Sequence, residues 1–557
     1  MATNPADSFE NIGLTELVDL VRSVLADLER ERAEKRTLQS QLQRERAEKT
    51  DLQAAVLEQR REIEQLKDEI RRLKNLPPRP PIKPSGMEKA TPAADPKASQ
   101  DEVARRRRGP GVSKLKIDRE VTLPAPAPEG SRRRGFEDIV VQDICFGPLT
   151  TLYRRERRET PQGRMIVAEL PPGVIGGCGP HLHRLVLMLH FQGQMTCERI
   201  VTLLSAVGVA ISKRQVVRLL TAKLETFQAE DIQVFEAGLR GSAYITVDDT
   251  GARHAGKACF TTQFGSPRFT TFRTRPSKSR LAFLANLLSA TARYAINAAA
   301  LAYMHAAHLA QGVIDALQGA EQRDFVNQAE WRAHLRALGV TELRVQPDPV
   351  RVASEAALWG AIQAQGLLHG AVIVSDDAGQ FRVGEHALCW VHAERLVHKL
   401  LPANQPQRNA VEVTRRMIWW LYGRLKAYKL APRPQEAADL AAVFDRIFRR
   451  KTGYASLDNL LKRLRGRKDE LLRVLERPEI PLNTNASEND IRTIVTKRKV
   501  SGGTVSQRGR DARDVMLGLA KTCKRLGLSF FDYIGDRIGI DGLKIPPLAS
   551  LVNPAPA

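Results

Sequence analysis

The chain has 557 residues, enough for roughly three or four folding units, so a single small binding module is excluded. Lysine and arginine total 86 against 63 aspartates and glutamates, and the resulting formal charge of +23 favours a polyanionic partner. The six cysteines include no Cys-x-x-Cys pair, which argues against both a disulfide framework and a four-cysteine zinc module.

A heptad repeat dominates the first segment, residues 1–76. The a and d positions keep one register from Leu14 to Leu73, and thirteen of these eighteen positions are apolar. The hexapeptide RERAEK occurs twice, two heptads apart, and returns Glu and Lys to the same seam positions. We expect a coiled coil that joins copies of the chain into a homo-oligomer, with a solvated single helix as the alternative. No basic region followed by an apolar run opens the chain, so we expect no secretory signal and a cytoplasmic protein.

Residues 77–135 are rich in proline and carry two basic runs, Arg105–Arg108 and Arg132–Arg134. Few large apolar residues interrupt these runs, so the segment cannot bury enough surface to fold alone and is predicted to be a basic linker. Two roles are open for its arginines: they hold DNA phosphates non-specifically, or they only keep the tether soluble.

Residues 136–238 are expected to contain a small β region followed by two short helices around a glycine turn. Thr196 can cap the first helix, Gly208 supplies the turn and Ser212 can cap the second. The second helix presents polar and basic side chains to a major groove: Lys213, Arg214, Gln215 and Arg218. The pattern predicts a helix-turn-helix DNA-binding domain, although similar helix pairs also occur in ordinary bundles.

Residues 239–380 contain two β-branched runs that each end in a pair of aspartates. The first, AYITVDDTGARH, delivers Asp248 and Asp249, and two more strand-like runs follow it. The second, GAVIVSDDAGQF, delivers Asp376 and Asp377. Acidic residues at the ends of strands can form a metal site, although an aspartate pair at a strand end is also an ordinary turn.

A third carboxylate lies in PLNTNASENDIRTIVTKRK. Asn485 can cap a helix that carries Glu488 on its first turn and Arg492 one turn later, on the same face. Three carboxylates from two strands and a helix suit two Mg²⁺ ions, which prefer oxygen ligands and can promote phosphodiester chemistry. The alternative is structural, because the helix dipole by itself favours a glutamate on the first turn.

A set of motifs connects these residues in chain order: VDDT, IVSDDAGQF, LCWVHAERL, N-x-x-E-N-D-x-R followed by KRKVSGG, and LAKTCKRLGLSFFDYI. Together with the earlier stretches YRRERRETPQG and LPPGVIGGCGP, the set closely resembles the insertion sequence 66 family of bacterial transposases, from about Asp138 to Ile534. The resemblance implies a multidomain protein with an N-terminal α-helical coiled coil, a helix-turn-helix DNA-binding domain and an α/β ribonuclease-H-like catalytic core that contains an α-helical insertion.

The resemblance also implies a DDE triad of Asp248, Asp376 and Glu488, which would be both the catalytic residues and the ligands of Mg²⁺, with Mn²⁺ as a substitute. Successive residues of a strand face opposite sides, so one aspartate of each pair can face the metals, and the first of each pair sits where the family places its ligand. The implied reaction has two steps: water attacks DNA at the ends of the element, and the freed 3′ hydroxyl then attacks target DNA.

The expected organisation is as follows: coiled-coil helix 1–76, linker 77–135, β region and helix-turn-helix 136–238, catalytic core 239–380 and 480–545, helical insertion 381–479, and tail 546–557. Two departures from the family stand out. Cys145 and Cys178 lack the partners of the zinc segment that members often carry before the helix-turn-helix. A helical stretch over 292–366 exceeds what the family leads us to expect, and its uncharged run 294–314 predicts a buried helix, not a membrane span.

Further basic residues are candidates for DNA contacts. We expect His392 and Arg395 to reach the scissile phosphate, and Arg492 to lie beside Glu488. After Glu488, a basic run precedes the Gly502–Gly503 turn and is expected to contact phosphates: Lys497, Arg498 and Lys499. The alternative for this run is a solvated basic loop.

Two aromatic and metal-ligating patterns remain open. His386, Cys389 and His392 recur every three residues and would share one helix face, but a zinc site needs a fourth ligand and none is evident, so we favour a helix that packs Cys389 and its neighbour beneath the active site. A second pattern could be a core stripe or could stack on an unpaired base: Trp419, Trp420 and Tyr422.

The favoured function is a DNA transposase that cuts at the ends of an insertion element and joins the 3′ ends to target DNA. Its expected partners are double-stranded DNA with terminal inverted repeats, target DNA, other copies of the chain and small accessory proteins of the element, with no membrane and a location at the bacterial nucleoid. The alternative is a catalytically inactive, transposase-derived DNA-binding regulator. A structural scaffold held by the coiled coil is a third hypothesis, and it leaves the acidic residues unused.

Overall fold

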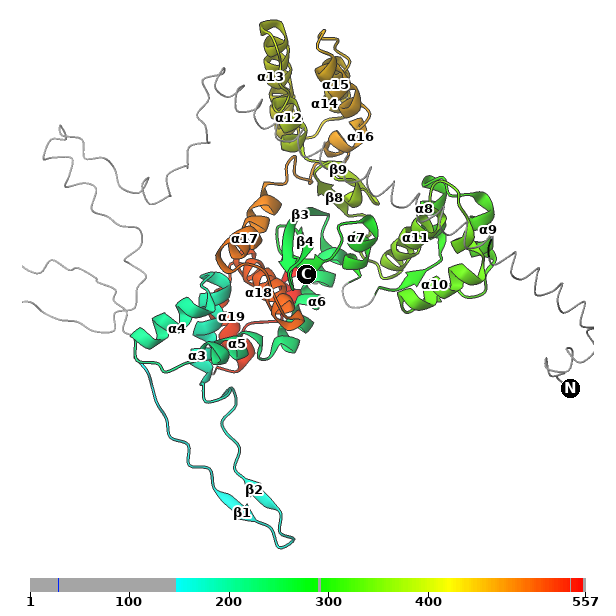
Figure 1. Ribbon diagram of the computed structural model, residues 1–557. Coiled ribbons are helices and arrows are strands. Elements are labelled where there is room, and N and C mark those ends of the chain that lie inside the picture. The colour runs from blue at the N-terminus through cyan, green and yellow to red at the C-terminus, as the bar shows by residue number, and fades with distance from the viewer. Residues whose placement is uncertain (1–28, 30–146, 289–291, 541, 554–557) are drawn as a thin grey trace, which may run out of the picture. The chain divides into compact units, whose positions relative to one another are not determined.

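The computed structural model describes residue 29 and residues 147–288, 292–540 and 542–553. The chain divides into two units, 1–142 and 143–557, and every element named below belongs to the second (Figure 1). Apart from the helical residue Glu29, the predicted coiled coil and linker lie outside the described residues. None of the helices in the described ranges combines the length and apolar character that a membrane span requires.

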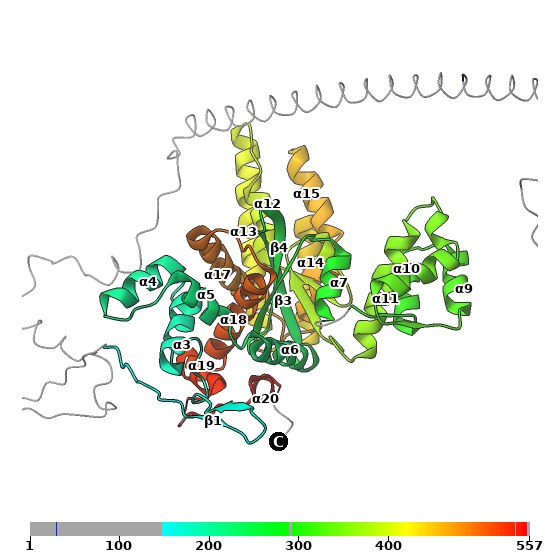
Figure 2. The ribbon, with the colours of Figure 1, turned by 60° about the horizontal axis from the view of Figure 1, so that its bottom comes forward.

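A five-stranded mixed sheet forms the centre of this unit, and helices surround it (Figures 1 and 2). The strand order is β5-β4-β3-β8-β9. The pairs β5–β4 and β4–β3 are antiparallel, and the pairs β3–β8 and β8–β9 are parallel. The strands are β3 Tyr244–His254, β4 Lys257–Gly265, β5 Thr270–Arg275, β8 Val372–Ser375 and β9 His386–Leu388. The predicted strands are therefore present, and the expected mixed α/β fold is confirmed.

One strand boundary differs from the prediction. Asp248 and Asp249 lie in the middle of β3, because antiparallel pairing with β4 continues to His254 opposite Lys257. Ala255 and Gly256 close this hairpin with positive φ angles of 48° and 76°. The parallel partner β8 pairs only with Tyr244–Thr246, so the sheet edge beside Asp248 is open.

Helices from distant parts of the chain cover the sheet. They are α6 Leu224–Gly241, α7 Arg280–Leu287, α17 Asn485–Ser501 and α18 Gln507–Arg525. Phe235 of α6 meets Phe264 of β4 at 5.1 Å between ring centroids, and Phe264 stacks on Phe283 of α7. Helix α18 packs closely on β5 at Gly518, where a Cβ would lie 3.1 Å from the carbonyl oxygen of Thr270.

A helical bundle precedes the sheet in the sequence and is completed by the last helices of the chain. Its elements are α3 Pro180–Leu187, the π-helical turn η3 Met188–Gln192, α4 Cys197–Ala206, α5 Lys213–Thr221, α19 Phe530–Ile538 and α20 Leu548–Val552. Thr196 accepts a hydrogen bond from the backbone of Arg199 and caps α4, as expected. Ser212 caps α5 through a capping box with Gln215. A small hairpin, β1 Arg157–Glu159 and β2 Met165–Val167, comes before the bundle.

The stretch 292–366 is a compact subdomain of helices and two very short strands. Its elements are β6 Tyr294–Ala295, α8 Ala298–Ala306, α9 Gln311–Gly319, β7 Asp324–Phe325, α10 Gln328–Ala337, η4 Val340–Glu342 and α11 Pro349–Ala364. The prediction of one buried helix over 294–314 is wrong. Asn297 caps α8, and His308 adopts a positive φ of 54° that ends this helix before α9 begins.

A second set of helices follows β9 and has its own apolar core. The elements after β8 are η5 Gly379–Phe381, α12 Trp390–His398, α13 Gln405–Tyr428, α14 Pro434–Phe448, α15 Ala455–Arg465, α16 Lys468–Leu471 and η6 Arg473–Leu475. Strand β9 lies inside the range 381–479, which was expected to be helical, because its residues pair with β8 and extend the sheet.

Candidate active site

Asp248 and Asp376 are brought together by the parallel pairing of β3 with β8. Thr246 pairs with Val374, and the two aspartates lie two residues further along their chains. Because side chains alternate with a period of two along a strand, Asp248 and Asp376 fall in the same row and on the same side. The two predicted aspartates therefore lie close together, although only Asp376 follows the end of its strand.

The environment of Asp248 makes its charge costly. Burial, together with the negative charges of Asp376 and Asp249, raises the pKa of Asp248 to about 6. A hydrogen bond from the backbone N–H of Asp249 to Oδ1, at 2.8 Å, and the nearby imidazole of His392 act in the opposite direction. A cation between Asp248 and Asp376 would relieve both the desolvation and the repulsion.

The second aspartate of each pair has a different partner. Asp249 Oδ2 accepts a hydrogen bond from Gln380 Nε2 at 2.7 Å. Asp377 forms an ion pair with Arg467 at 3.3 Å. The side chains of Asp249 and Asp377 are thus engaged outside the row that Asp248 and Asp376 share.

Glu488 lies on the first turn of α17 and faces α12. Its Oε1 is 3.2 Å from Arg395 Nη1 and 3.6 Å from His392 Nε2. The same Oε1 atom is buried and accepts no well-formed hydrogen bond from the described residues. Arg492, one turn later, is only 3.9 Å from the other carboxylate oxygen. The helix begins at Asn485 itself, with Thr484 before it, so the predicted cap by Asn485 is wrong.

His392 connects the aspartates to the glutamate. A hydrogen bond with Cys389 raises the pKa of His392, with a smaller contribution from Asp376 and against the effect of burial. Its Nδ1 atom lies 3.4 Å from Thr484 Oγ1, at the start of the helix that carries Glu488. The site therefore combines one residue of β3, the residue that follows β8, one residue of α12 and one residue of α17.

The expected helix face with His386, Cys389 and His392 is wrong. His386 belongs to β9, where it hydrogen-bonds Ser375 at 2.8 Å and Glu470 at 3.1 Å. Cys389 is the residue before α12 and accepts a hydrogen bond from the backbone of Thr484. Trp390 is buried, in agreement with the packing role that we favoured.

A cavity of about 410 Å³ opens beside Asp376, between the sheet and α12. Its polar wall includes Arg395 and Lys399, and its apolar wall includes Leu396 and Leu464. Lys399 had no predicted role, yet it follows His392 by seven residues and Arg395 by four, a helical spacing that could have identified it. The cavity offers cations and an apolar surface next to the acidic pair.

The acidic side chains fit the metal that the family implies only in part. Within the described ranges, no group of three or more His, Cys, Asp and Glu side chains is close enough together to hold a metal ion. Asp248 and Asp376 fit a divalent cation, because they are neighbouring oxygen donors whose charges repel each other. Glu488 does not yet complete the set, because Arg395 and His392 occupy its carboxylate.

Asp490 is a residue of this site that carried no predicted role. Its Oδ2 atom accepts hydrogen bonds from Thr270 at 2.8 Å and Arg525 at 2.5 Å, and Gln263 lies 3.4 Å away. Asp490 is thereby bound to β4, β5 and α18, and it holds the first turns of α17 against the sheet. Its spacing could have identified this role. A residue two positions after Glu488 lies on roughly the opposite side of the helix, which here faces the sheet.

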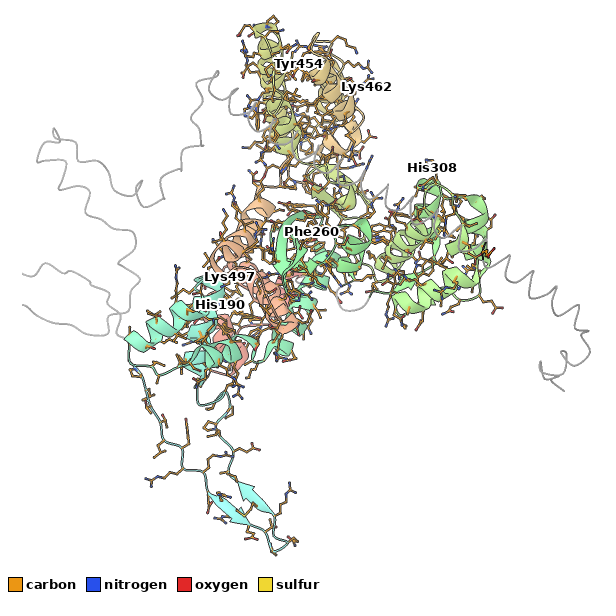
Figure 3. The ribbon with its side chains drawn as sticks, viewed as in Figure 1. His190, Phe260, His308, Tyr454, Lys462 and Lys497 are labelled. Carbon is orange, nitrogen blue, oxygen red and sulfur yellow. The ribbon has the colours of Figure 1, made fainter. Side chains whose placement is uncertain are left out.

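The predicted phosphate contact by Lys497 is wrong. Lys497 is only 3% exposed, and its ammonium donates to the carbonyl oxygens of His190 at 2.8 Å and Met195 at 3.3 Å (Figure 3). Burial lowers the pKa of Lys497 to about 8. Gln194 makes a second link, donating to the carbonyl oxygen of Thr493. These contacts join α17 to the π-helical turn of the bundle.

The other predicted DNA contacts lie closer to the surface. Arg214, Arg218, Arg492 and Lys499 are exposed. Lys213 is exposed and pairs with Glu198, Gln215 is used in the cap of α5, and Arg498 donates to the carbonyl oxygen of Gly251. The run from Lys497 to Lys499 is helical, so it is not a basic loop. On α13, Trp419 and Trp420 are 41% and 55% exposed, which contradicts a core stripe.

The link between Lys497 and His190 predicts a pH dependence of stability. Burial and the neighbouring Lys497 lower the pKa of His190 to about 3, whereas an unfolded histidine titrates near 6.5. The unfolded chain therefore binds more protons than the folded chain below pH 6.5, and stability is lost as the pH falls toward 3. At pH 5 we expect His190 to account for about 2 kcal/mol of this loss.

Urea unfolding of the wild type and of His190→Gln, at pH 7.5 and pH 5, measures this effect. Gln carries no proton to gain, so the variant should lose less stability between the two pH values. An equal loss in both proteins would contradict the assignment to His190.

Comparisons with known proteins give independent information. Residues 359–512 match the model of the family described as "Transposase IS66 family". This range includes Asp376, His392, Arg395 and Glu488. The chain is also 54% identical, over 319 residues, to the uncharacterized protein y4jO of Sinorhizobium fredii, and the match covers 57% of this chain and 99% of that protein. Two of the three candidate acids and the helices between them thus fall inside the matched range, and the chain belongs to the IS66 family of transposases.

Proposed function

We propose that the protein is a DNA transposase that cuts at the ends of its element and joins the 3′ ends to target DNA. The observation that carries this proposal is the closeness of Asp248, on β3, to Asp376, which directly follows the parallel neighbour β8, next to a helix that presents Glu488. The strand order β5-β4-β3-β8-β9 agrees with the ribonuclease-H-like core that the resemblance implies.

The three acids would form the DDE triad. Asp248 and Asp376 would hold Mg²⁺, or Mn²⁺ in its place, and Glu488 would join them. When bound, such ions activate the attacking oxygen and stabilise the leaving oxygen of a phosphodiester. The cations that line the cavity, Arg395 and Lys399, would position the DNA backbone at the acids. A phosphate that binds Arg395 would compete with Glu488 for the guanidinium and free the carboxylate.

DNA recognition would fall to the bundle before the sheet. Helices α4 and α5 with the turn at Gly208 would be the helix-turn-helix, and α5 exposes Lys213, Arg214 and Arg218. The heptad repeat at the N-terminus would assemble copies of the chain. Each copy would then bind one terminal inverted repeat through its helix-turn-helix, so that two copies hold two repeats together.

Purified full-length protein tests the proposal with duplex DNA that carries the sequences flanking its gene. We expect nicked and joined products with Mg²⁺ or Mn²⁺, and none after addition of EDTA, as resolved on a denaturing gel. DNA binding, measured separately by fluorescence anisotropy, should persist in EDTA. Binding without products under all metal conditions would instead favour the inactive regulator.

A further inference from the structure

The hairpin of β1 and β2 is formed by its turn and not by a core. Thr160 and Arg164 close the turn, with the N–H of Thr160 donating to the carbonyl of Arg164 at 2.9 Å. The N–H of Gly163 donates to the carbonyl of Thr160 at 2.8 Å, and Gly163 has a φ of 77°. Pro161 also suits a turn. The sequence TPQG therefore preforms the hairpin locally.

Neither face of this hairpin is buried. Met165 and Ile166 are 46% and 55% exposed. The register places Arg158 beside Ile166 on one face, and Arg157 beside Val167 on the other. Each face thus mixes arginine with an apolar side chain, and an isolated two-stranded hairpin is marginally stable in water. The exposed hairpin is therefore available to bind another molecule (Figure 1).

The charge of the hairpin indicates the chemistry of that partner. Within the described residues, Arg154, Arg157 and Arg164 form no ion pair. Arg158 pairs with Glu156, but both side chains are more than 60% exposed, at 77% and 66%, so this pair contributes little and is easily exchanged. An excess of guanidinium groups on an extended ribbon favours the binding of a polyanion.

Both roots of the hairpin rest on the helix pair α4–α5. At the first root, Pro148 packs against Gly208 in the turn between these helices, where a Cβ would lie 3.5 Å from the proline ring. At the second root, Gly176 approaches the guanidinium of Arg218 on α5, at 2.8 Å for a Cβ. Gly176 and Gly177 have positive φ angles of 56° and 81°, which allow this close turn. The two arms that carry the hairpin thus start beside the basic helix, and the hairpin itself projects away from it (Figure 1).

We propose that residues 154–167 form a second DNA-binding element, a two-stranded ribbon that lies in a groove of the DNA next to the segment bound by α5. This inference rests on the proposed function, because it assigns further DNA contacts to the region of the proposed helix-turn-helix. The major groove, about 12 Å wide, admits a two-stranded ribbon. Arginines would contact phosphates and guanine edges, and Ile166 or Met165 would contact thymine methyl groups.

The test compares two triple variants of the full chain that remove the same charge. One is Arg157→Ala, Arg158→Ala and Arg164→Ala in the hairpin. The other is Arg332→Ala, Arg336→Ala and Arg344→Ala, three exposed arginines of the 292–366 subdomain. Fluorescence anisotropy with a labelled mixed-sequence duplex gives the affinity as a function of salt. A duplex with the flanking DNA of the gene gives the hydroxyl-radical footprint.

The hairpin triple should bind at least about tenfold more weakly near 0.15 M salt, and its salt slope should fall by roughly 0.9 for each DNA phosphate that the variant no longer neutralises. Its footprint should shorten on one side of the segment that α5 protects. The inference is overturned if the hairpin triple matches the subdomain triple, or if the hairpin triple has a smaller oligomer mass, which would make the hairpin an interface between copies.

A third variant distinguishes a failure of the hairpin assignment from a failure of the proposed function. Lys213→Ala with Arg214→Ala removes two of the three exposed cations of α5 and leaves Arg218, which lies beside Gly176 at the second root of the hairpin. If this variant loses binding while the hairpin triple behaves as the subdomain control, only the hairpin assignment fails. If the wild type shows no salt-dependent affinity for either duplex, the proposed function itself fails.

Discussion

Changing Asp248, Asp376 or Glu488 to its amide is expected to abolish most strand cleavage, with a loss of roughly 10²- to 10³-fold for each single change. The amides Asp248→Asn, Asp376→Asn and Glu488→Gln keep the shape of the side chain and remove its charge. The charge is what a divalent cation requires, because neutral amides are far weaker ligands. Product formation on flanking-sequence DNA, in single-turnover conditions, measures the loss.

Asp249→Asn is the matched control for this series. Asp249 neighbours Asp248 on β3, but its carboxylate accepts a hydrogen bond from Gln380, a contact that an asparagine oxygen can also make. The control should cleave at nearly the wild-type rate, and all four variants should bind DNA with unchanged affinity. A control that fails as badly as Asp248→Asn would show that the first aspartate has no special role.

Removing the carboxylate of Asp490 is expected to cost about 3 kcal/mol of unfolding free energy, because it leaves the half-buried guanidinium of Arg525, 18% exposed, without its ion-pair partner. In Asp490→Ala, Thr270 would lose the acceptor of its hydroxyl, and Arg525 would keep only its hydrogen bonds to Thr270 and to the carbonyl oxygen of Ser266. Because Asp490 holds the first turns of α17 on the sheet, the position of Glu488 should also loosen and cleavage should fall. Urea unfolding followed by tryptophan fluorescence gives the stability.

Asn489→Ala serves as the control for Asp490, since it lies next to Asp490 on the exposed side of α17. It should change stability by less than about 0.5 kcal/mol, as expected for a surface position. Asp490→Asn should fall between these two variants, because an amide oxygen can still accept from Thr270. Equal unfolding midpoints for Asp490→Ala and Asn489→Ala would rule out the anchoring role.

The acidic pair could be predicted from sequence because its signal is local. A β-branched run indicates a buried strand, and two such runs in one α/β chain favour parallel neighbours. The caps at Thr196 and Ser212 were predicted for the same reason, since a cap depends on residues within three positions. Strand β3 continues past Asp248 because it pairs with β4 as far as His254. The residues around Asp248 do not indicate this pairing.

The partners of buried polar groups could not be predicted in this way. Lys497 accompanies Ile491 and Ile494 at a spacing of three residues, which continues the buried side of α17, but its acceptors lie about three hundred positions earlier in η3 and just after it. Likewise, Arg395 was expected at a phosphate and is found beside Glu488. Charge alone does not distinguish a cation that binds a ligand from one that binds the protein.

Helices α19 and α20 complete the surroundings of α6, which is synthesised about three hundred residues earlier. Glu230 of α6 accepts hydrogen bonds from Tyr533 at 2.8 Å and Arg537 at 2.7 Å in α19, and from the backbone of Leu548 in α20. While the ribosome is still synthesising the sheet and both helical insertions, this carboxylate has none of these partners. A nascent or prematurely terminated chain would therefore expose a buried charge and an unfinished apolar face. The helical bundle can therefore finish folding only after α19 and α20 have been synthesised.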